Sequence, residues 1–429
     1  MTTGEVTPNR RADMRVFHGI SGAAGQPGSI VAALRDLGID AVSYISGKNQ
    51  FGYAFDRQIS TESDLHSALF QLLQSDLQGF DVFHFYFRPL FFDHRQAHYP
   101  MGLDLLLLRL LNKKLIMNFR GSEVRLHSQF KSRSPFNYVD ENPDELVEKF
   151  PEASQRKLIS LTSSLCHHVI VPDPELQSYV PNATVVPRSI DLRQWAPSPM
   201  AAKDRPLVVH APSRRAVKGT DSILAAVEQL QQEGLNFDFK LVEGLTNAQA
   251  RELYRDSDII IDQLRIGWYG VLAVEGMALQ KAVISYVRDD LAHHLGDQPP
   301  IAIANPESIK PVLMRLINSQ DERSRLAERG RRYCEATHDA KIVAEQLIEI
   351  YASPGNAVRP GEAIQFFDVQ HTQHLELQAQ QAAASRELSR ELAIAERKLE
   401  LTQAHLDSVL TRLAPLIKLR NLSRKLIGR

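Results

Sequence analysis

The chain has 429 residues, which is too long for one ordinary domain, so we expect two globular domains and an additional segment. Its formal net charge of -1 at pH 7 excludes a strong overall attraction to nucleic acid. Only two cysteines occur, Cys166 and Cys334, and they lack C-x-x-C spacing, which argues against a disulfide framework or a structural zinc site.

The N-terminal residues are polar and lack the apolar run of a signal peptide. The most apolar stretch, residues 102–111, is short and carries Asp104 and Arg109. We therefore expect no membrane-spanning segment, and the cysteine usage favours a reducing, cytoplasmic location.

From residue 15 onward, short β-branched or aromatic runs alternate with helix-period stretches, which is typical of a parallel sheet covered on both faces. The expected strands of the first half are 15–20, 40–45, 81–87, 114–119, 167–172 and 183–187. A turn-rich segment then interrupts the series, and we place the first domain at 14–195.

A second series of the same kind predicts another domain at 205–352. Its expected strands are 207–211, 237–244, 258–262 and 282–287, and residues 307–352 are expected to form two or three closing helices. The predicted fold class is α/β, with two Rossmann-like domains facing a cleft, where ligands bind in this architecture.

After residue 352 the composition changes to that of a solvated helix, with a linker at 353–368 and a long helix or coiled coil at 369–414. Alternating steps of four and three separate the residues of one apolar seam: Leu388, Leu392, Ala395, Leu399, Thr402, Leu406, Val409 and Leu413. This spacing indicates a coiled coil and self-association. The alternative is one amphipathic helix that folds back on the globular body.

A basic amphipathic tail is predicted at 415–429, where Pro415 is expected to break the helix. The tail contains basic residues and leucines at near-helical spacing and no acid, so it could lie on an anionic membrane. A solvated helix end or a docking segment for a protein partner is the alternative. Co-sedimentation with anionic vesicles, with and without the residues after Asp407, distinguishes these interpretations.

The segment VVHAPSRRAVKGTD places Arg214, Arg215 and Lys218 just after an expected strand and just before an expected helix. Such a turn points backbone amides and cations at one place, which suits a phosphate group. Basic residues in these loops are as often only solvated, so the local pattern leaves both interpretations open.

The segment RIGWYGVLAVEGMAL places Gly267 and Gly270 before an expected helix that carries Glu275. A helix N-terminus behind a glycine can bind diphosphate, and a carboxylate further along the helix can accept hydrogen bonds from ribose hydroxyls. Glu275 could instead be solvated, but its neighbours Val274 and Met277 disfavour this, because an unpaired carboxylate in an apolar segment is costly.

With these two segments, residues 14–352 resemble the retaining glycosyltransferases of family four, which have the GT-B fold. The resemblance implies that Lys218, Gly219 and an arginine hold the donor diphosphate, and it favours Arg214 over the neighbouring Arg215 for this arginine. It also implies that Gly270 and Val271 lie near the phosphates and that Glu275 binds the ribose. The first acid of the family's Glu-x7-Glu motif is absent, because Gly267 holds its position.

The resemblance places the acceptor on the N-terminal domain, near Gly25, Gly28, His84 and Arg120. Arg120 stands where many relatives have an active-site histidine. His84 lies two residues from Tyr86 on an expected strand, so both side chains face one side and could reach the cleft. A packed aromatic strand is the alternative.

The expected function is therefore sugar transfer from a nucleoside diphosphate sugar to an acceptor hydroxyl in bacterial surface polysaccharide or glycoconjugate synthesis, with retained configuration. The expected acceptor is a carbohydrate, a lipid-linked molecule or a glycoconjugate. No metal or other cofactor is expected, since Asp256 and Asp258, which mimic a metal-binding D-x-D motif, span a helix end and a strand start. Because Gly267 and Arg120 depart from the family pattern, a non-catalytic scaffold of the same fold is the alternative.

Overall fold

The computed structural model describes residues 14–46, 49, 51–59, 77–88, 102–140, 150–200, 203–356 and 360–427, with the side chains of the last range described for 379–415. The chain divides into a first unit, Met1–Ala363, which contains both sheets, and a second unit, Ile364–Arg429. Among the described residues, no helix is long and apolar enough to cross a membrane.

The described N-terminal residues form a seven-stranded parallel sheet in the order β3-β2-β1-β4-β5-β6-β7. Its strands are β1 (Arg15–Gly19), β2 (Asp40–Ser46), β3 (Arg57–Ile59), β4 (Val82–Tyr86), β5 (Lys114–Asn118), β6 (His168–Val171) and β7 (Thr184–Val185). Its helices are α1 (Gln26–Asp36), α3 (Leu103–Leu110), α4 (His127–Arg133), α6 (Glu152–Leu165) and α7 (Pro174–Gln177), with 3-10 turns η2 (Ala23–Gly25) and η3 (Leu77–Gly79).

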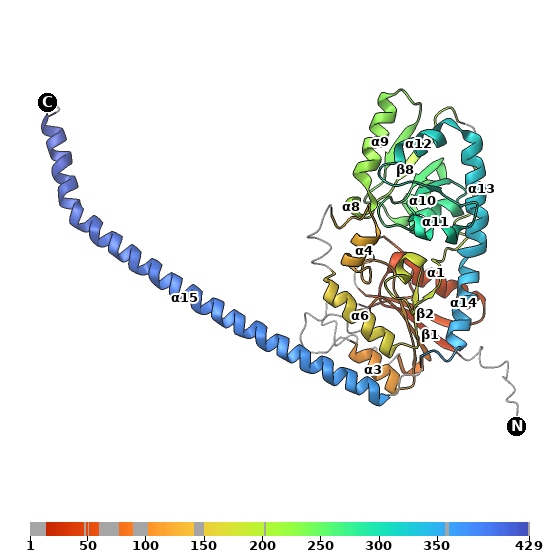
Figure 1. Cartoon of the computed structure of the whole chain (residues 1–429), viewed down its shortest axis with the longest axis horizontal. Helices are drawn as coiled ribbons and strands as arrows, with labels where there is room; N and C mark the ends of the chain where they lie inside the picture. Colours follow the sequence, from red (N-terminus) through yellow and green to blue (C-terminus); the bar gives the residue numbers. More distant parts are fainter. Residues whose placement is uncertain are drawn as a thin grey trace. The chain divides into compact units, whose positions relative to one another are not determined.

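The C-terminal domain has a five-stranded parallel sheet in the order β12-β11-β10-β8-β9 (Figure 1). Its strands are β8 (Leu207–His210), β9 (Asp238–Leu241), β10 (Ile259–Ile261), β11 (Ala282–Ser285) and β12 (Ala302–Ile303). Its helices are α8 (Arg215–Lys218), α9 (Thr220–Gln232), α10 (Asn247–Asp256), α11 (Val271–Ala278), α12 (Ile309–Asn318) and α13 (Gln320–Thr337), with the 3-10 segment η4 (Asp289–Leu295).

The central strand β10 shows why the sequence specifies a sheet with helices on both faces. Ile259, Ile260 and Ile261 have no exposed surface. Successive side chains of a strand point to opposite faces, so Ile259 and Ile261 pack with α9 and α12, while Ile260 packs with α10, α11 and α13. A continuous apolar run is the pattern that such a two-sided burial requires.

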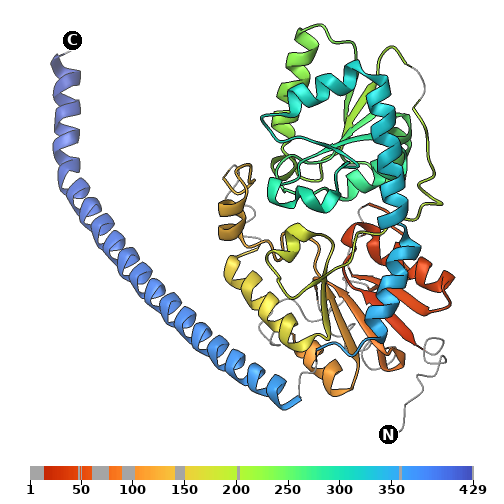
Figure 2. The ribbon, with the colours of Figure 1, turned by 45° about the vertical axis from the view of Figure 1, so that its right-hand side comes forward.

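The last helix of the first unit, α14 (Ala340–Ala352), packs on the N-terminal domain rather than on the domain that precedes it in sequence. Its residues Val343, Leu347 and Tyr351 share a buried cluster with Val16 of β1 and Ile30 of α1. Figure 2 shows α13 and α14 following one another along both domains. The predicted C-terminal range, 205–352, thus includes a helix that completes the other domain's core.

Each strand expected from the sequence is present, and the two sheets confirm the predicted α/β class. Two edge strands were not predicted: β3 and β12. They are three and two residues long, and β3 begins with the exposed polar residues Arg57 and Gln58, so neither has the apolar run that identified the others.

The second unit consists of most of one long helix, α15 (Pro360–Ile427), which confirms the predicted C-terminal helix. The helix begins within the predicted linker, 353–368, and it does not break at Pro415 as predicted. Pro360 is the first residue of the helix, where a proline costs nothing because its missing N–H would lack a partner anyway. Strong helix formers, mainly leucine, lysine and arginine, flank Pro415 within the helix.

Candidate functional site

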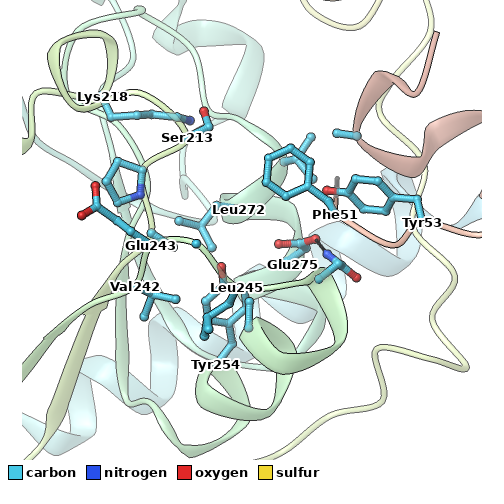
Figure 3. Close-up of a pocket in the computed structure, with 17 residues that line it drawn as sticks. Phe51, Tyr53, Ser213, Lys218, Val242, Glu243, Leu245, Tyr254, Leu272 and Glu275 are labelled. Carbon is cyan, nitrogen blue, oxygen red and sulfur yellow. Dashed lines mark hydrogen bonds between the residues drawn. The ribbon is translucent and has the colours of Figure 1, made fainter. Parts of the chain in front are cut away.

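A pocket of about 330 Å³ lies at the carboxyl ends of the C-terminal strands (Figure 3). Loops that follow β8 and β9 line it, as does the start of α11, which follows β10. The carboxyl edge of a parallel sheet is where this architecture binds ligands. Its lining residues are Ala24, Phe51, Tyr53, Ala211, Pro212, Ser213, Lys218, Val242, Glu243, Gly244, Leu245, Asn247, Ala250, Tyr254, Val271, Leu272 and Glu275.

Lys218, the last residue of α8, carries the cation that faces this pocket. Its Nζ lies 2.9 Å from Asp262 Oδ1 and 2.6 Å from Gln263 Oε1. The Asp262 side chain has no exposed surface, and only 14% of the Lys218 side chain is exposed. A buried carboxylate requires a partner of this kind, so the pair fixes the ammonium group at the edge of the pocket.

Asp262 also joins Lys218 to the N-terminus of α11. Its Oδ2 accepts a hydrogen bond from the backbone N–H of Gly270, the N-cap residue of α11. A Cβ atom on Gly270 would lie 3.0 Å from Asp262 Oδ2 and 3.2 Å from Lys218 Nζ. Glycine is therefore needed here for close approach, and the carboxylate occupies the place at the helix N-terminus that suits an anion.

Glu275 lies further along α11 and lines the same pocket. Burial raises its pKa to about 8, and the nearby Asp262 adds to the effect, although a hydrogen bond from Asn247 acts in the opposite direction. Asn247 Nδ2 donates this bond to Glu275 Oε1 over 3.1 Å. At neutral pH Glu275 is therefore largely protonated, and a hydroxyl donor would favour its charged form.

A loop of the N-terminal domain forms the opposite wall of the pocket. Figure 3 shows Phe51 and Tyr53 on one side of the pocket and Lys218 on the other. The backbone N–H of Asn247 donates to the carbonyl of Phe51 over 3.1 Å. Burial and the charge of Glu275 raise the pKa of Tyr53 to about 12, and Asn247 also bonds to its side chain. Asn247 thus connects the two domains at the pocket.

Gly25 and Gly28, predicted for the acceptor side, support this loop instead of lining the pocket. A Cβ atom on Gly25 would lie 2.5 Å from Cδ1 of Tyr53, and one on Gly28 would lie 2.2 Å from the carbonyl oxygen of Ala54. Their lack of a side chain lets the loop pack on the start of α1.

The structure gives the two neighbouring arginines different surroundings. Arg215 is exposed and forms a 2.6 Å ion pair with Glu243. Arg214 is half-buried, and its Nη2 lies 3.3 Å from Ser122 Oγ of the N-terminal domain. Within the described part of the chain, Arg214 forms no ion pair, so its charge remains available.

The other predicted donor residues flank the pocket. Val271 lines it, whereas Gly219 joins α8 to α9 and Gly267 lies in the loop before α11, where its carbonyl accepts from the N–H of Arg288 over 3.1 Å. The structure therefore brings Lys218, Val271 and Glu275 together around one cavity, and Gly270 lies next to the Lys218 ammonium group.

His84 lies inside the N-terminal domain and has no exposed surface. Its Nδ1 lies 2.7 Å from the hydroxyl of Tyr351, and its Nε2 lies 3.2 Å from the amide of Asn118. Burial and the neighbouring His18 hold its pKa well below the usual value. This placement agrees with the packed aromatic strand, the alternative interpretation, rather than with direct contact with an acceptor.

Arg120 is half-buried, and its Nη1 lies 3.4 Å from Asn118 Oδ1. Removal from water lowers its pKa to about 10, and the nearby charge of Arg188 contributes. Arg120 and Ser122, the partner of Arg214, belong to the same short loop. The candidate acceptor-side cation therefore lies close in sequence to Ser122, the residue that the Arg214 side chain contacts.

Asp256 and Asp258 lie at the amino end of β10, away from the carboxyl edge that forms the pocket. Asp258 Oδ2 accepts from the backbone N–H of Leu207 over 2.7 Å, and Ser257 Oγ donates to the carbonyl of Tyr254. These are backbone-binding roles of the capping kind. The described residues contain no group of three or more histidine, cysteine, aspartate or glutamate side chains that could hold a metal ion.

Replacing Glu275 by glutamine tests the environment of this carboxyl group. The folded protein holds the proton up to a pKa of about 8, against a usual value of 4.5, so the free energy of unfolding should fall as pH rises between these values. We expect Glu275→Gln to abolish this decline and to be roughly 1 to 2 kcal/mol more stable than wild type at pH 8.5. Thermal unfolding between pH 5 and 9 measures the difference.

Glu243→Gln is the matched control, because Glu243 lines the same pocket but a hydrogen bond from Arg215 lowers its pKa. Because Glu275 is intact in this variant, its stability should show the same decline between pH 4.5 and pH 8 as wild type. Parallel pH profiles for wild type and Glu275→Gln would contradict the inferred burial of an acid.

Comparison with models of known protein families found no match, and comparison with curated proteins found none. Solved structures do resemble the chain, each over 79% of its length. Sucrose-phosphate synthase from Thermosynechococcus elongatus has 13% identity, 98% of its chain covered and a TM-score of 0.55. HepE from Anabaena, in complex with UDP and glucose, has 12% identity, 99% covered and a TM-score of 0.53. The catalytic domain of starch synthase IV from Arabidopsis thaliana, bound to ADP and acarbose, has 13% identity, 99% of its chain covered and a TM-score of 0.51.

At these identities the likeness concerns the fold alone. With its parallel sheets of seven and five strands, the chain has the two-domain GT-B architecture of these enzymes, extended by a long C-terminal helix.

Proposed function

We propose that the chain is a glycosyltransferase that moves a sugar from a nucleoside diphosphate to an acceptor hydroxyl. The observation that carries this proposal is the grouping of Lys218, Val271 and Glu275 around one cavity at the N-terminus of α11. HepE binds UDP and glucose and starch synthase IV binds ADP on the same fold, which supports a nucleotide donor.

In this proposal the nucleoside lies against the apolar wall formed by Val242, Leu245 and Tyr254. The ribose hydroxyls donate to Glu275, whose ionised form they stabilise. The diphosphate then extends toward Lys218 and the start of α11, where the helix dipole favours negative charge.

Charge develops on the leaving diphosphate as the bond to the sugar breaks, and the enzyme must stabilise it. Lys218 alone is insufficient, since Asp262 already neutralises it. Arg214 forms no ion pair within the described residues, and it precedes α8, at whose other end Lys218 lies. We therefore assign the leaving-group role to Arg214 and Lys218 together, with Asp262 as the group that positions Lys218.

The finer parts of the proposal rest on the family resemblance of the sequence. They are retention of the anomeric configuration, independence from metal ions, and an acceptor from surface polysaccharide or glycoconjugate synthesis that binds near Arg120. A cytoplasmic location with the basic tail on a membrane is a further part, but the side chains of 416–429 lie outside the described residues.

A non-catalytic binding protein of the same fold is the second candidate. Two observations favour it: Gly267 replaces the first motif acid, and an internal carboxylate pairs with Lys218. Such a protein would bind the nucleotide sugar without releasing free nucleoside diphosphate in the presence of any acceptor.

The donor site can be tested by thermal shift with UDP, GDP, ADP and TDP, followed by transfer or hydrolysis assays with the corresponding sugars. One nucleotide should raise the unfolding temperature most. We expect Arg214→Ala and Lys218→Ala to weaken its binding by about 1.5 to 3 kcal/mol, roughly ten- to a hundredfold in Kd.

Lys203→Ala is the control for loss of one lysine charge, because Lys203 is exposed and contacts Asp258 and Asp256 at the other end of the sheet. Wild-type affinity in all three variants would refute the diphosphate site. Binding without turnover for every sugar would favour the non-catalytic candidate.

Metal independence is tested by assaying turnover after treatment with EDTA. We expect the rate to stay within about twofold, because cations and a helix N-terminus supply the stabilisation of charge. Loss of turnover that magnesium or manganese restores would show that a metal site had been missed.

A further inference from the structure

The second unit presents a row of apolar side chains that its own helix does not cover. This seam consists of Leu388, Leu392, Ala395, Leu399, Thr402, Leu406, Val409 and Leu413, all of which are exposed. Leu388 and Leu399 keep 70% and 67% of their surface in contact with water. A contiguous apolar row on a long helix indicates a partner that covers it.

We propose that the seam packs against the same seam of a second copy of this chain, in an antiparallel two-stranded coiled coil. The seam runs for 26 residues, or about 39 Å of helix at 1.5 Å per residue, from Leu388 to Leu413. The inference rests on α15 (Pro360–Ile427) alone and does not depend on the proposed donor site.

Side-chain size favours the antiparallel orientation. Leucine occupies one set of seam positions: Leu392, Leu399, Leu406 and Leu413. The other set holds Leu388 and three smaller residues: Ala395, Thr402 and Val409. In antiparallel pairs each set packs against the other, so large side chains meet small ones, which fills a core evenly. In parallel pairs each set meets itself, and the layers of paired leucines would alternate with smaller layers of paired alanine, threonine or valine.

One antiparallel register gives the layers Leu392 with Val409, Leu399 with Thr402, and Leu406 with Ala395, each between the two copies. Because the arrangement is two-fold symmetric, every layer occurs twice. Leu413 and Leu388 complete the two ends.

The charges beside the seam select this register. The residue that precedes each seam leucine of the first set changes from acidic to basic along the helix: Glu391, Lys398, His405 and Arg412. In the proposed register Glu391 faces Arg412 of the second copy, and Lys398 faces His405. A shift of one heptad would place Lys398 against Lys398 or against Arg412, which is repulsive.

A parallel pair lacks this complementarity, because Glu391 would face Glu396 of the second copy. Glu391 and Arg412 are exposed, and in the described part of α15 neither belongs to an ion pair within the chain. Both charges are therefore available to a second copy.

The first experiment measures the mass of the full chain by sedimentation equilibrium. We expect a dimer, with twice the chain mass of 48.3 kDa, that Leu399→Asp combined with Leu406→Asp converts to a monomer. Leu401→Asp combined with Ile394→Asp is the matched control, because these residues are 61% and 58% exposed but lie outside the seam. A monomeric wild type, or equal dissociation by both pairs of substitutions, would overturn the proposal.

The second experiment determines orientation by exchange of charges. We expect Glu391→Arg alone and Arg412→Glu alone to raise the dimer Kd about tenfold, because each replaces two attractive pairs by repulsive ones, and the double variant to restore it. In a parallel coil Glu391→Arg would instead tighten the dimer, and the double variant would show no rescue. Either of those results contradicts the antiparallel pairing, and circular dichroism checks that each variant remains helical.

Discussion

The ion pair between Lys218 and Asp262 is the interaction on which the candidate site depends. It connects the segment after β8 with the segment after β10, and through the N–H of Gly270 it fixes the start of α11. Breaking one partner would leave an uncompensated buried charge. The same pair affects the electrostatics of the pocket, because Asp262 balances the charge of Lys218. Arg214, in contrast, forms no ion pair within the described residues. A bound diphosphate would therefore compete with Asp262 for the helix N-terminus.

Asn247 has a comparable position between the domains. Its backbone binds the carbonyl of Phe51 in the N-terminal domain, and its side chain binds Glu275 in the C-terminal domain. A ligand that changes the charge of Glu275 also acts on the contact that joins the domains. Under the proposed function, donor binding and the contact between the domains would thus share one residue.

The sequence predicted the strands because two-sided burial leaves an unbroken apolar run, as in Ile259–Ile261. The family resemblance implied that Lys218 and Glu275 serve one donor, and both line the same cavity. The sequence missed Asp262, Asn247 and Tyr53, whose roles depend on partners far away in sequence, although an acid directly after a buried strand was a usable signal. It favoured Arg214 over Arg215 from the family pattern alone, because the partners that distinguish them, Ser122 and Glu243, lie far away in sequence.

Hydrogen–deuterium exchange with and without saturating nucleoside diphosphate tests the central claim most directly, since bound ligand slows the opening of the segments it contacts. The account predicts slower exchange in the backbone of 211–219, 242–247 and 268–276, and in the facing loop at 51–55. Protection confined to other segments, while the nucleotide is bound, would show that the pocket between Lys218 and Glu275 is not the donor site.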